Sequence, residues 1–161
     1  MTGRTEEDAS HARDGCRPPV VSIVTPCYNE EGNLPELISR VRAVMTKENV
    51  EYEHIVIDNA STDQSIAVLR SEAAADSQLR VILNVRNFGH IRSPFHAMMQ
   101  ARGSCVILLA SDLQDPPEVV PELLAAWRAG SPIALLVKEE TEEVGVMAFG
   151  RSMAFTTFSK L

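Results

Sequence analysis

The chain has 161 residues, enough for one domain with a hydrophobic core, and its 45% apolar and 23% charged residues are typical of globular proteins. Its formal net charge of −7 argues against a nucleic-acid partner, which needs a basic surface. The three widely spaced cysteines, Cys16, Cys27 and Cys105, provide neither a disulfide framework nor a zinc-ligand spacing, so we expect a reducing, cytoplasmic location.

Residues 1–18 are polar and are followed by Pro19, and we interpret them as a disordered lead-in. Glu6, Glu7 and Asp8 stand where a signal peptide would need an apolar stretch, so no signal peptide is expected. No apolar run in the chain approaches the roughly 20 residues that cross a bilayer.

Between residues 19 and 140, short apolar runs alternate with segments of helical periodicity, and we interpret this range as one domain. The expected strands are 20–24 (stopping at Pro26), 54–57, 79–85, 106–109 and 133–137. The expected helices are 33–47, 63–75, 90–102 and 118–129. Strands that are apolar throughout and alternate with helices predict an α/β fold with a mostly parallel, Rossmann-like sheet covered by helices on both faces.

The last segment, 141–161, has a different pattern. Val144, Met147, Phe155, Phe158 and Leu161 could lie along one side of a helix, with no further element to cover it. An uncovered amphipathic segment of this kind predicts contact with a membrane surface or association into homo-oligomers.

Polar residues gather after three of the expected strands: Tyr28 to Glu31, Asp58-Asn59, and Ser111 to Gln114. In open α/β sheets, ligands bind outside the carboxyl ends of the strands. Acids and amides that converge on this edge predict a site for a polar ligand and a divalent cation.

Asp112-Leu113-Gln114 is the sharpest candidate for the cation. In an extended segment, residues two apart point the same way, so Asp112 and Gln114 would offer two oxygens to one side. Oxygen ligands suit Mg²⁺ or Mn²⁺. A solvated loop explains these two residues equally well.

The other candidates each have a structural alternative. Asp58 could accept a hydrogen bond from a ligand N–H or from the Ser61-Thr62 turn, and Tyr28 could stack on a base or close the core. Arg86 could meet phosphate or remain solvated. His54, inside a strand, is interpreted as structural.

Asp115 has the position of a helix N-cap. In Asp115-Pro116-Pro117-Glu118, an acid is followed by proline at the first helical position and by glutamate three residues after the cap. Asn33-Leu34-Pro35-Glu36 has the same form. We expect both segments to begin helices rather than to bind the cation.

Four segments in order carry a resemblance: Val21 to Glu31, Ile57 to Asp63, Arg86 to Gly89, and Asp112 to Glu118. Together they resemble the inverting family 2 glycosyltransferases of the GT-A fold, especially the polyprenyl- or dolichyl-phosphate sugar transferases. This resemblance implies transfer of a sugar from a nucleoside-diphosphate sugar, with UDP preferred, to a polyprenyl phosphate at the cytoplasmic face of the membrane.

By the same resemblance, the site residues receive roles. Pro26, Tyr28 and Glu30 would frame the nucleoside, with Arg86 also assigned to nucleotide binding, and Asp58 would bind the base. Asp112 and Gln114 would hold Mg²⁺ or Mn²⁺ on the diphosphate and so be the catalytic pair.

The chain departs from the family at two places and in length. Ala110 and Asn59 stand where the family often has acids, and the family continues well beyond the position of Leu161. We therefore expect the acceptor side to be missing and the chain to bind donor but transfer sugar poorly. The alternatives are a non-catalytic nucleotide-sugar-binding remnant and an interaction module.

Overall fold

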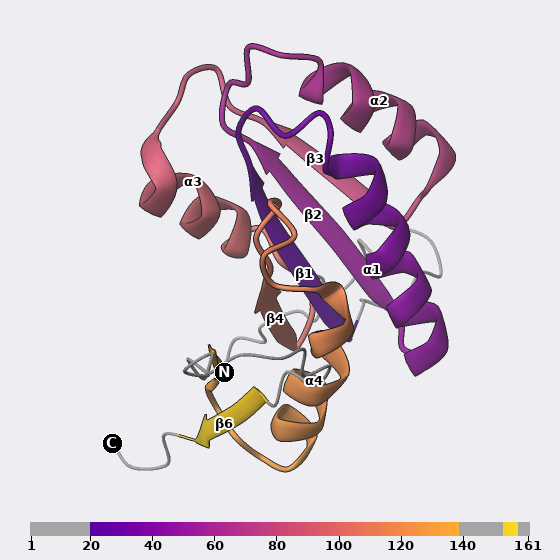
Figure 1. Cartoon of the computed structure of the whole chain (residues 1–161), viewed down its shortest axis with the longest axis vertical. Coiled ribbons are helices and arrows are strands. Elements are labelled where there is room, and N and C mark those ends of the chain that lie inside the picture. The colour runs from indigo at the N-terminus through magenta and orange to yellow at the C-terminus, as the bar shows by residue number, and fades with distance from the viewer. Residues whose placement is uncertain (1–19, 139–152, 158–161) are drawn as a thin grey trace, which may run out of the picture.

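The computed structural model describes residues 20–138 and the backbone of residues 153–157 (Figure 1). In chain order the elements are β1 (Val21–Cys27), α1 (Leu34–Glu48), β2 (Tyr52–Asp58), α2 (Ser65–Ala75), β3 (Leu79–Leu83), α3 (Gly89–Met98), β4 (Cys105–Leu108), the 3₁₀ helix η1 (Pro117–Val119), α4 (Val120–Arg128), β5 (Ala134–Lys138) and β6 (Met153–Thr157). The alternation of strands and helices predicted from the sequence is confirmed as far as α4.

Four strands form one parallel sheet in the order β3-β2-β1-β4. The central strands β1 and β2 are buried along almost their whole length, as a sheet covered on both faces requires. β1 continues through Pro26 instead of stopping there. The pairing of β1 with β4 ends at Val24↔Leu108, so the edge of β1 that faces β4 makes no strand pairs at Pro26. The proline is tolerated there because it has no N–H to donate.

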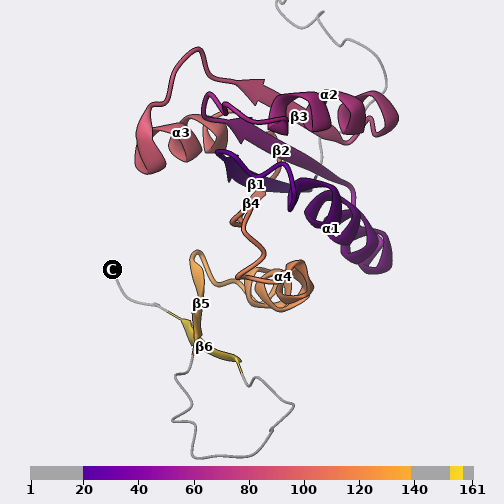
Figure 2. The same ribbon diagram turned by 45° about the horizontal axis from the view of Figure 1, so that its top comes forward.

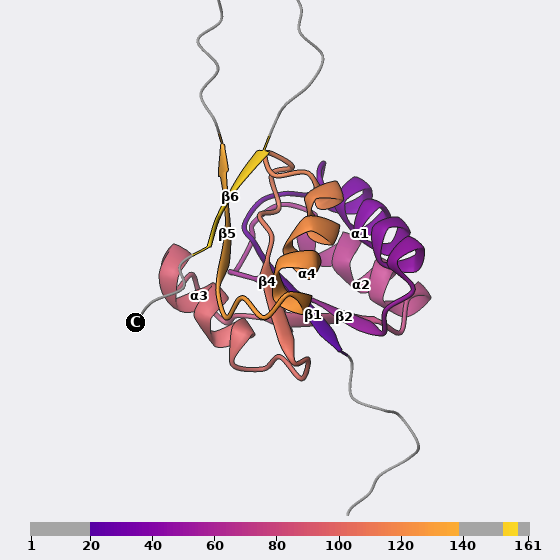
Figure 3. The ribbon, with the colours of Figure 1, turned by 90° about the horizontal axis from the view of Figure 1, so that it is seen from below.

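Helices cover both faces of the sheet, with α1 and α2 on one face and α3 on the other (Figures 2 and 3). Consecutive residues of β2 point to opposite faces. Val56 packs with Leu69 of α2, whereas Ile55 and Ile57 pack with Ala97 of α3. The predicted fold class, a mostly parallel α/β sheet with helices on both faces, is confirmed.

The prediction for the end of the chain is wrong in two respects. β5 does not extend the parallel sheet but pairs antiparallel with β6, with Ala134 opposite Thr157. The expected C-terminal helix is a strand over Met153–Thr157, a segment whose aromatic and threonine residues favour strands once a partner edge is present. Residues 1–18 and the other residues of 141–161 lie outside the described part of the chain.

The start of α4 also differs from the prediction. The N-cap position of η1 is Pro116 and not Asp115, and no side-chain hydrogen bond caps this helix. Glu118 instead accepts a hydrogen bond of 2.9 Å from Nε of Arg40 on α1, which ties the two helices together. Asn33 does occupy the N-cap position of α1, but its side chain does not cap that helix. Within the described residues, no helix has the length and apolar character needed to span a membrane.

Candidate functional site

The loops that follow β1 and β2 are joined by hydrogen bonds at the carboxyl edge of the sheet. The backbone N–H of Asn29 donates to Ser61 Oγ at 2.9 Å, and the backbone N–H of Thr62 donates to Asn29 Oδ1 at 2.8 Å. The backbone N–H of Asn59 donates to the carbonyl oxygen of Cys27 at 2.8 Å. These bonds hold the two loops in one fixed arrangement beside Asp58.

Asp58 ends β2 with a fully buried carboxylate (0% exposed). Its Oδ2 accepts a hydrogen bond of 3.0 Å from the backbone N–H of Ser61, so the predicted turn interaction is confirmed. Its Oδ1 is buried and has no hydrogen-bond partner among the described residues. Because an unpaired buried acceptor costs about 1–3 kcal/mol, this oxygen is suited to a ligand N–H.

Asn59 organises the loop between β3 and α3. Its Oδ1 accepts from Asn84 Nδ2 at 3.1 Å and from the backbone N–H of Phe88 at 2.9 Å. Its Nδ2 donates to Asn87 Oδ1 at 2.9 Å and to the carbonyl oxygen of Gly89 at 3.3 Å. An aspartate could not donate these last two bonds while ionised, so the asparagine at this position has a structural reason.

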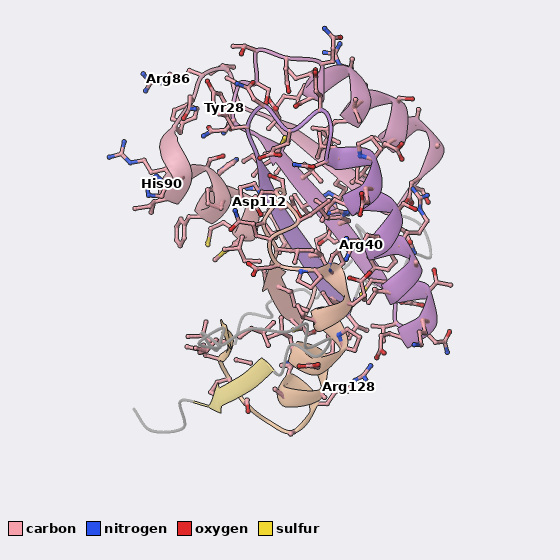
Figure 4. All side chains as sticks on the ribbon, in the orientation of Figure 1. Tyr28, Arg40, Arg86, His90, Asp112 and Arg128 are labelled. Carbon is pink, nitrogen blue, oxygen red and sulfur yellow. The ribbon has the colours of Figure 1, made fainter. Side chains whose placement is uncertain are left out.

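The same loop presents Arg86 at the periphery of the site. Its guanidinium lies 4.9 Å from the centroid of the Phe88 ring, a cation–π contact. Figure 4 shows Arg86 projecting outward and Tyr28 beyond the ends of the strands, with Asp112 on a separate loop. Tyr28 is half exposed, which excludes a role in closing the core.

The extended geometry predicted for Asp112 and Gln114 is wrong. Leu113 between them has a left-handed backbone (φ 59°), and Asp112 Oδ1 accepts a hydrogen bond of 3.1 Å from the backbone N–H of Gln114. Both side chains are exposed on a tight turn, so the two-residue spacing does not place them on one side.

The donor set fits a cation bound mainly by its substrate. No group of three His, Cys, Asp or Glu side chains gathers within the described residues. The Asp112 carboxylate, exposed on the loop after β4, can supply oxygen to a Mg²⁺ or Mn²⁺ ion that takes its other ligands from phosphates and water. The residues present therefore fit a cation that arrives with a diphosphate.

Left-handed backbone conformations cluster in these loops. Besides Leu113, Asn29 (φ 57°) and Ala60 (φ 64°) follow β1 and β2, and Asn49 at the end of α1 is the remaining non-glycine case in the described residues. Such conformations are strained for residues with a Cβ atom, Asn being the most tolerant, and they concentrate at binding sites. The carboxyl edge thus carries most of the described backbone strain.

Two buried groups in the sheet, Cys27 and His54, are not set up for proton transfer or nucleophilic attack. Burial, with a further contribution from the charge of Asp58, raises the pKa of Cys27 to about 12. Burial lowers the pKa of His54 to about 4, and its Nε2 lies 3.0 Å from Thr25 Oγ1. The structural interpretation of His54 agrees with its shift, and the raised pKa of Cys27 is that of an inert, buried thiol.

Pro26 and Glu30, which the resemblance assigns to the nucleoside, are both partly buried. Pro26 lies within β1, and Glu30 Oε2 accepts a hydrogen bond of 2.7 Å from Asn33 Nδ2. Asn84 and Asn87, whose amides complete the Asn59 network, were given no role on the basis of the sequence. Asn84 and Asn87 lie three residues apart in the segment that ends at Gly89. Asparagine and glycine are typical turn residues, so this spacing could have predicted an ordered loop here.

A cavity of about 760 Å³ lies elsewhere, between β4, α4 and β5. Its lining is mostly apolar and includes Val106, Leu108 and Trp127. Neither Asp58 nor Asp112 lines it, but Asp115 of the loop that carries Asp112 does.

Comparison with known families agrees with this geometry. The family described as "Glycosyl transferase family 2" matches residues 22–151. The chain belongs to glycosyltransferase family 2. It is 34% identical over 133 residues to the uncharacterized glycosyltransferase YkcC of Bacillus subtilis (strain 168), covering 83% of this chain and 41% of that protein.

A second relative is the undecaprenyl-phosphate 4-deoxy-4-formamido-L-arabinose transferase of Pseudomonas fluorescens (strain SBW25). It is 39% identical over 125 residues, covering 76% of this chain and 36% of the relative. This glycosyltransferase chain therefore spans about two fifths of the length of the curated relatives that it matches.

Two solved glycosyltransferase structures share the fold. A mannosyltransferase from Pyrobaculum calidifontis, in complex with GDP-Man and Mn²⁺, superposes with a TM-score of 0.64 at 22% identity, covering 83% of this chain and 40% of that one. Glucosyl-3-phosphoglycerate synthase from Mycobacterium tuberculosis, in complex with Mn²⁺, UDP and phosphoglyceric acid, gives 0.57 at 29% identity, covering 74% and 42%. The fold of this family 2 chain is accordingly that of the GT-A glycosyltransferases.

Proposed function

We propose that this chain binds the nucleoside diphosphate of a sugar donor at the carboxyl edge of its sheet, for transfer of the sugar to a polyprenyl phosphate. The observation that carries the proposal is the buried Oδ1 of Asp58, which lacks a hydrogen-bond partner among the described residues. A base N–H would satisfy it. The relatives named as undecaprenyl-phosphate sugar transferases support the choice of acceptor.

The geometry of Asp58 favours uracil over guanine. The Watson–Crick edge of uracil has one N–H donor that can bind a carboxylate, whereas that edge of guanine has two adjacent N–H donors. Oδ2 of Asp58 already accepts the Ser61 N–H, so the two donors of guanine would have to share Oδ1 or compete for Oδ2, whereas the single uracil N–H needs only Oδ1. We therefore propose a UDP-sugar as donor, with Tyr28 and Arg86 beside the nucleotide.

The Asp112 carboxylate would hold Mg²⁺ or Mn²⁺ on the diphosphate, with Gln114 next to it on the same turn. The cation, when bound, would neutralise the charge that develops on the departing diphosphate. A structural neighbour solved with Mn²⁺ and UDP supports the choice of cation.

The transfer step needs no general base. An oxygen of the acceptor phosphate forms a bond to the anomeric carbon while the bond from that carbon to the diphosphate breaks. The electron pair of the broken bond remains on the nucleoside diphosphate. Because a phosphate monoester is already anionic near neutral pH, no proton has to be removed, in agreement with the inert state of His54 and Cys27.

The test is calorimetric titration of UDP and GDP, with Mn²⁺ or with EDTA, into wild type, Asp58→Asn and Asp112→Asn. Asp58→Asn keeps the shape but removes one acceptor, so UDP affinity should fall roughly 10- to 100-fold both with and without the metal. Asp112→Asn should remove the gain in affinity from Mn²⁺ and leave the affinity in EDTA unchanged.

Asp76→Asn is the matched control, because this carboxylate accepts turn and arginine hydrogen bonds at the opposite edge of the sheet. It should bind UDP like the wild type. Equal UDP affinity of wild type and Asp58→Asn in EDTA would refute the role of Asp58. Nucleotide binding with poor transfer is the expected behaviour of this chain, because the acceptor side is expected to be missing. Nucleotide binding with neither transfer nor hydrolysis of the sugar donor would favour the non-catalytic alternative.

A further inference from the structure

The segment around α3 differs in charge from the rest of this acidic chain. No aspartate or glutamate occurs between Asp76 and Asp112, whereas the chain as a whole has a net charge of −7. The same stretch contains four arginines and two histidines: Arg80, Arg86, His90, Arg92, His96 and Arg102. This segment of the chain is therefore cationic, in contrast to the chain as a whole.

Most of these arginines form no ion pair within the described structure. Arg80 is paired with the buried Glu53. No ion pair within the described residues involves Arg86, Arg92 or Arg102, and all three side chains are exposed. Figure 4 shows Arg86 projecting from the loop before α3, and His90 at the start of the helix. These charges are available to an anionic partner.

An apolar stripe lies on the outer side of the same helix. Ile91, Phe95 and Met99, spaced four residues apart, are 71%, 59% and 68% exposed. The opposite side of α3 is the packed one, where Ser93, Pro94 and Ala97 are buried. Exposed large apolar side chains flanked by cations are the pattern of helices that lie in the interface of an anionic bilayer.

We infer that the outer face of α3, defined by Ile91, Arg92, Phe95 and Met99, together with Arg102 in the loop that follows the helix, docks on an anionic membrane surface. The apolar side chains enter the boundary of the acyl chains, and the arginines meet phosphate headgroups. Charge complementarity favours this occupant over a second copy of the chain, because a copy would bring its own cations to the same face. The inference is independent of the nucleotide site.

Arg92 and Arg102 contribute through charge, and Phe95 through burial in the lipid. Each arginine near an anionic surface is worth about fivefold in partitioning, so Arg92→Gln with Arg102→Gln should lower binding about 25-fold. Phe95→Ser should lower it on the order of tenfold. None of these side chains belongs to the proposed nucleotide site.

The experiment is sedimentation of the chain with vesicles of phosphatidylcholine containing a quarter phosphatidylglycerol, compared with phosphatidylcholine alone. Binding should require the anionic lipid and weaken at high salt. Arg70→Gln on α2, on the opposite face of the sheet, and Ile133→Ser are matched controls for charge and exposed apolar area. Both should bind like the wild type.

Three outcomes would overturn the inference. They are an absence of binding to anionic vesicles, equal binding by the α3 variants and the controls, and a fall in solution molecular mass for Phe95→Ser without a change in vesicle binding. The last would show that a second copy of the chain covers this face. UDP titration of the same variants should match the wild type, so failure here leaves the nucleotide proposal standing.

Discussion

Asp58 and Asn59 are adjacent in sequence but have different roles. Asp58 leaves one buried oxygen for a ligand, whereas Asn59 uses both atoms of its amide to fix the loop that carries Arg86 and Phe88. The neighbouring Asp112 adds an exposed carboxylate on a separate turn. At the residue scale, the carboxyl edge offers a buried acceptor at Asp58 and an exposed acid at Asp112, and the Asn59 amide fixes the loop after β3.

Replacement of Asn59 with aspartate should give a pH-dependent defect. The ionised carboxylate would face the oxygens of Asn87 and Gly89, which now receive hydrogen bonds from the amide. Loss of these bonds should loosen the loop and lower UDP affinity roughly 3- to 30-fold at neutral pH, from about 1–2 kcal/mol. At acidic pH the protonated carboxyl can donate again, and part of the affinity should return.

Calorimetry of UDP binding as a function of pH would measure this effect. Asn59→Ala is the comparison, because it removes the bonds without adding a titratable group. Its affinity should be reduced at all pH values. Parallel pH profiles of UDP affinity for the two variants would contradict the proposed role of the amide as hydrogen-bond donor.

At the scale of the elements, a buried polar network ties β1, β2, β3 and the start of β4 together at the amino end of the sheet. Ser22 Oγ donates to Glu53 Oε1 at 2.8 Å and accepts from the backbone N–H of Gly103 at 2.9 Å. Glu53 also accepts from the backbone N–H of Arg102 at 2.7 Å and pairs with Arg80. Burial alone would raise the pKa of Glu53, but these donors lower it overall.

Gly103→Ala should destabilise the fold. A Cβ atom at Gly103 would lie 2.7 Å from the backbone nitrogen of Ser22 and 2.8 Å from its Oγ, so the strands would have to move apart. Overpacking of this kind costs about 1–3 kcal/mol. Gly32→Ala is the control, because a Cβ there meets nothing within 4 Å.

Urea denaturation of both variants would measure the free energy of unfolding. Gly103→Ala should have a lower midpoint, whereas Gly32→Ala should match the wild type. UDP affinity of folded Gly103→Ala should change little, since the network lies at the edge away from Asp58. Equal midpoints for the two variants would contradict the close-packing argument.

At the scale of the whole molecule, the burial of a titratable side chain makes the stability of the fold depend on pH. His54 lies in the centre of the sheet with its pKa lowered from 6.5 to about 4 by burial. Below pH 6.5 the unfolded chain binds a proton at His54 that the folded chain does not. Stability should therefore rise with pH between about 4 and 6.5, by roughly 3 kcal/mol in total from this group.

Chemical denaturation across this pH range would measure the slope. His54→Gln should remove most of the slope between pH 5 and 6.5, whereas His96→Gln, at an exposed position, should retain it. Glu53 acts at lower pH. Because its pKa in the folded chain is below the ordinary value of 4.5, it stabilises the fold above pH 4.5, and this stabilisation is lost as the pH falls further. Identical slopes for wild type and His54→Gln in the upper range would contradict the assignment.

Local pattern was enough to predict the layered α/β fold and the edge at which the site forms. Buried strands such as Ile55-Val56-Ile57 read as continuous apolar runs because both faces of a parallel sheet are covered. Asp58 follows such a run directly, so its position at the carboxyl edge was predictable. Strand and helix periodicity are properties of neighbouring residues, and the sequence alone determines them.

Tertiary structure decided whatever depends on pairing between distant segments. β5 has the composition of a core strand, yet it pairs with β6 because strand partners are chosen by the whole fold. The left-handed Leu113 turned Asp112 and Gln114 away from the extended geometry that their spacing suggested. Asn59 meets Asn84 and Asn87 from about 25 residues away, and only the parallel register of β2 and β3 brings their amides together.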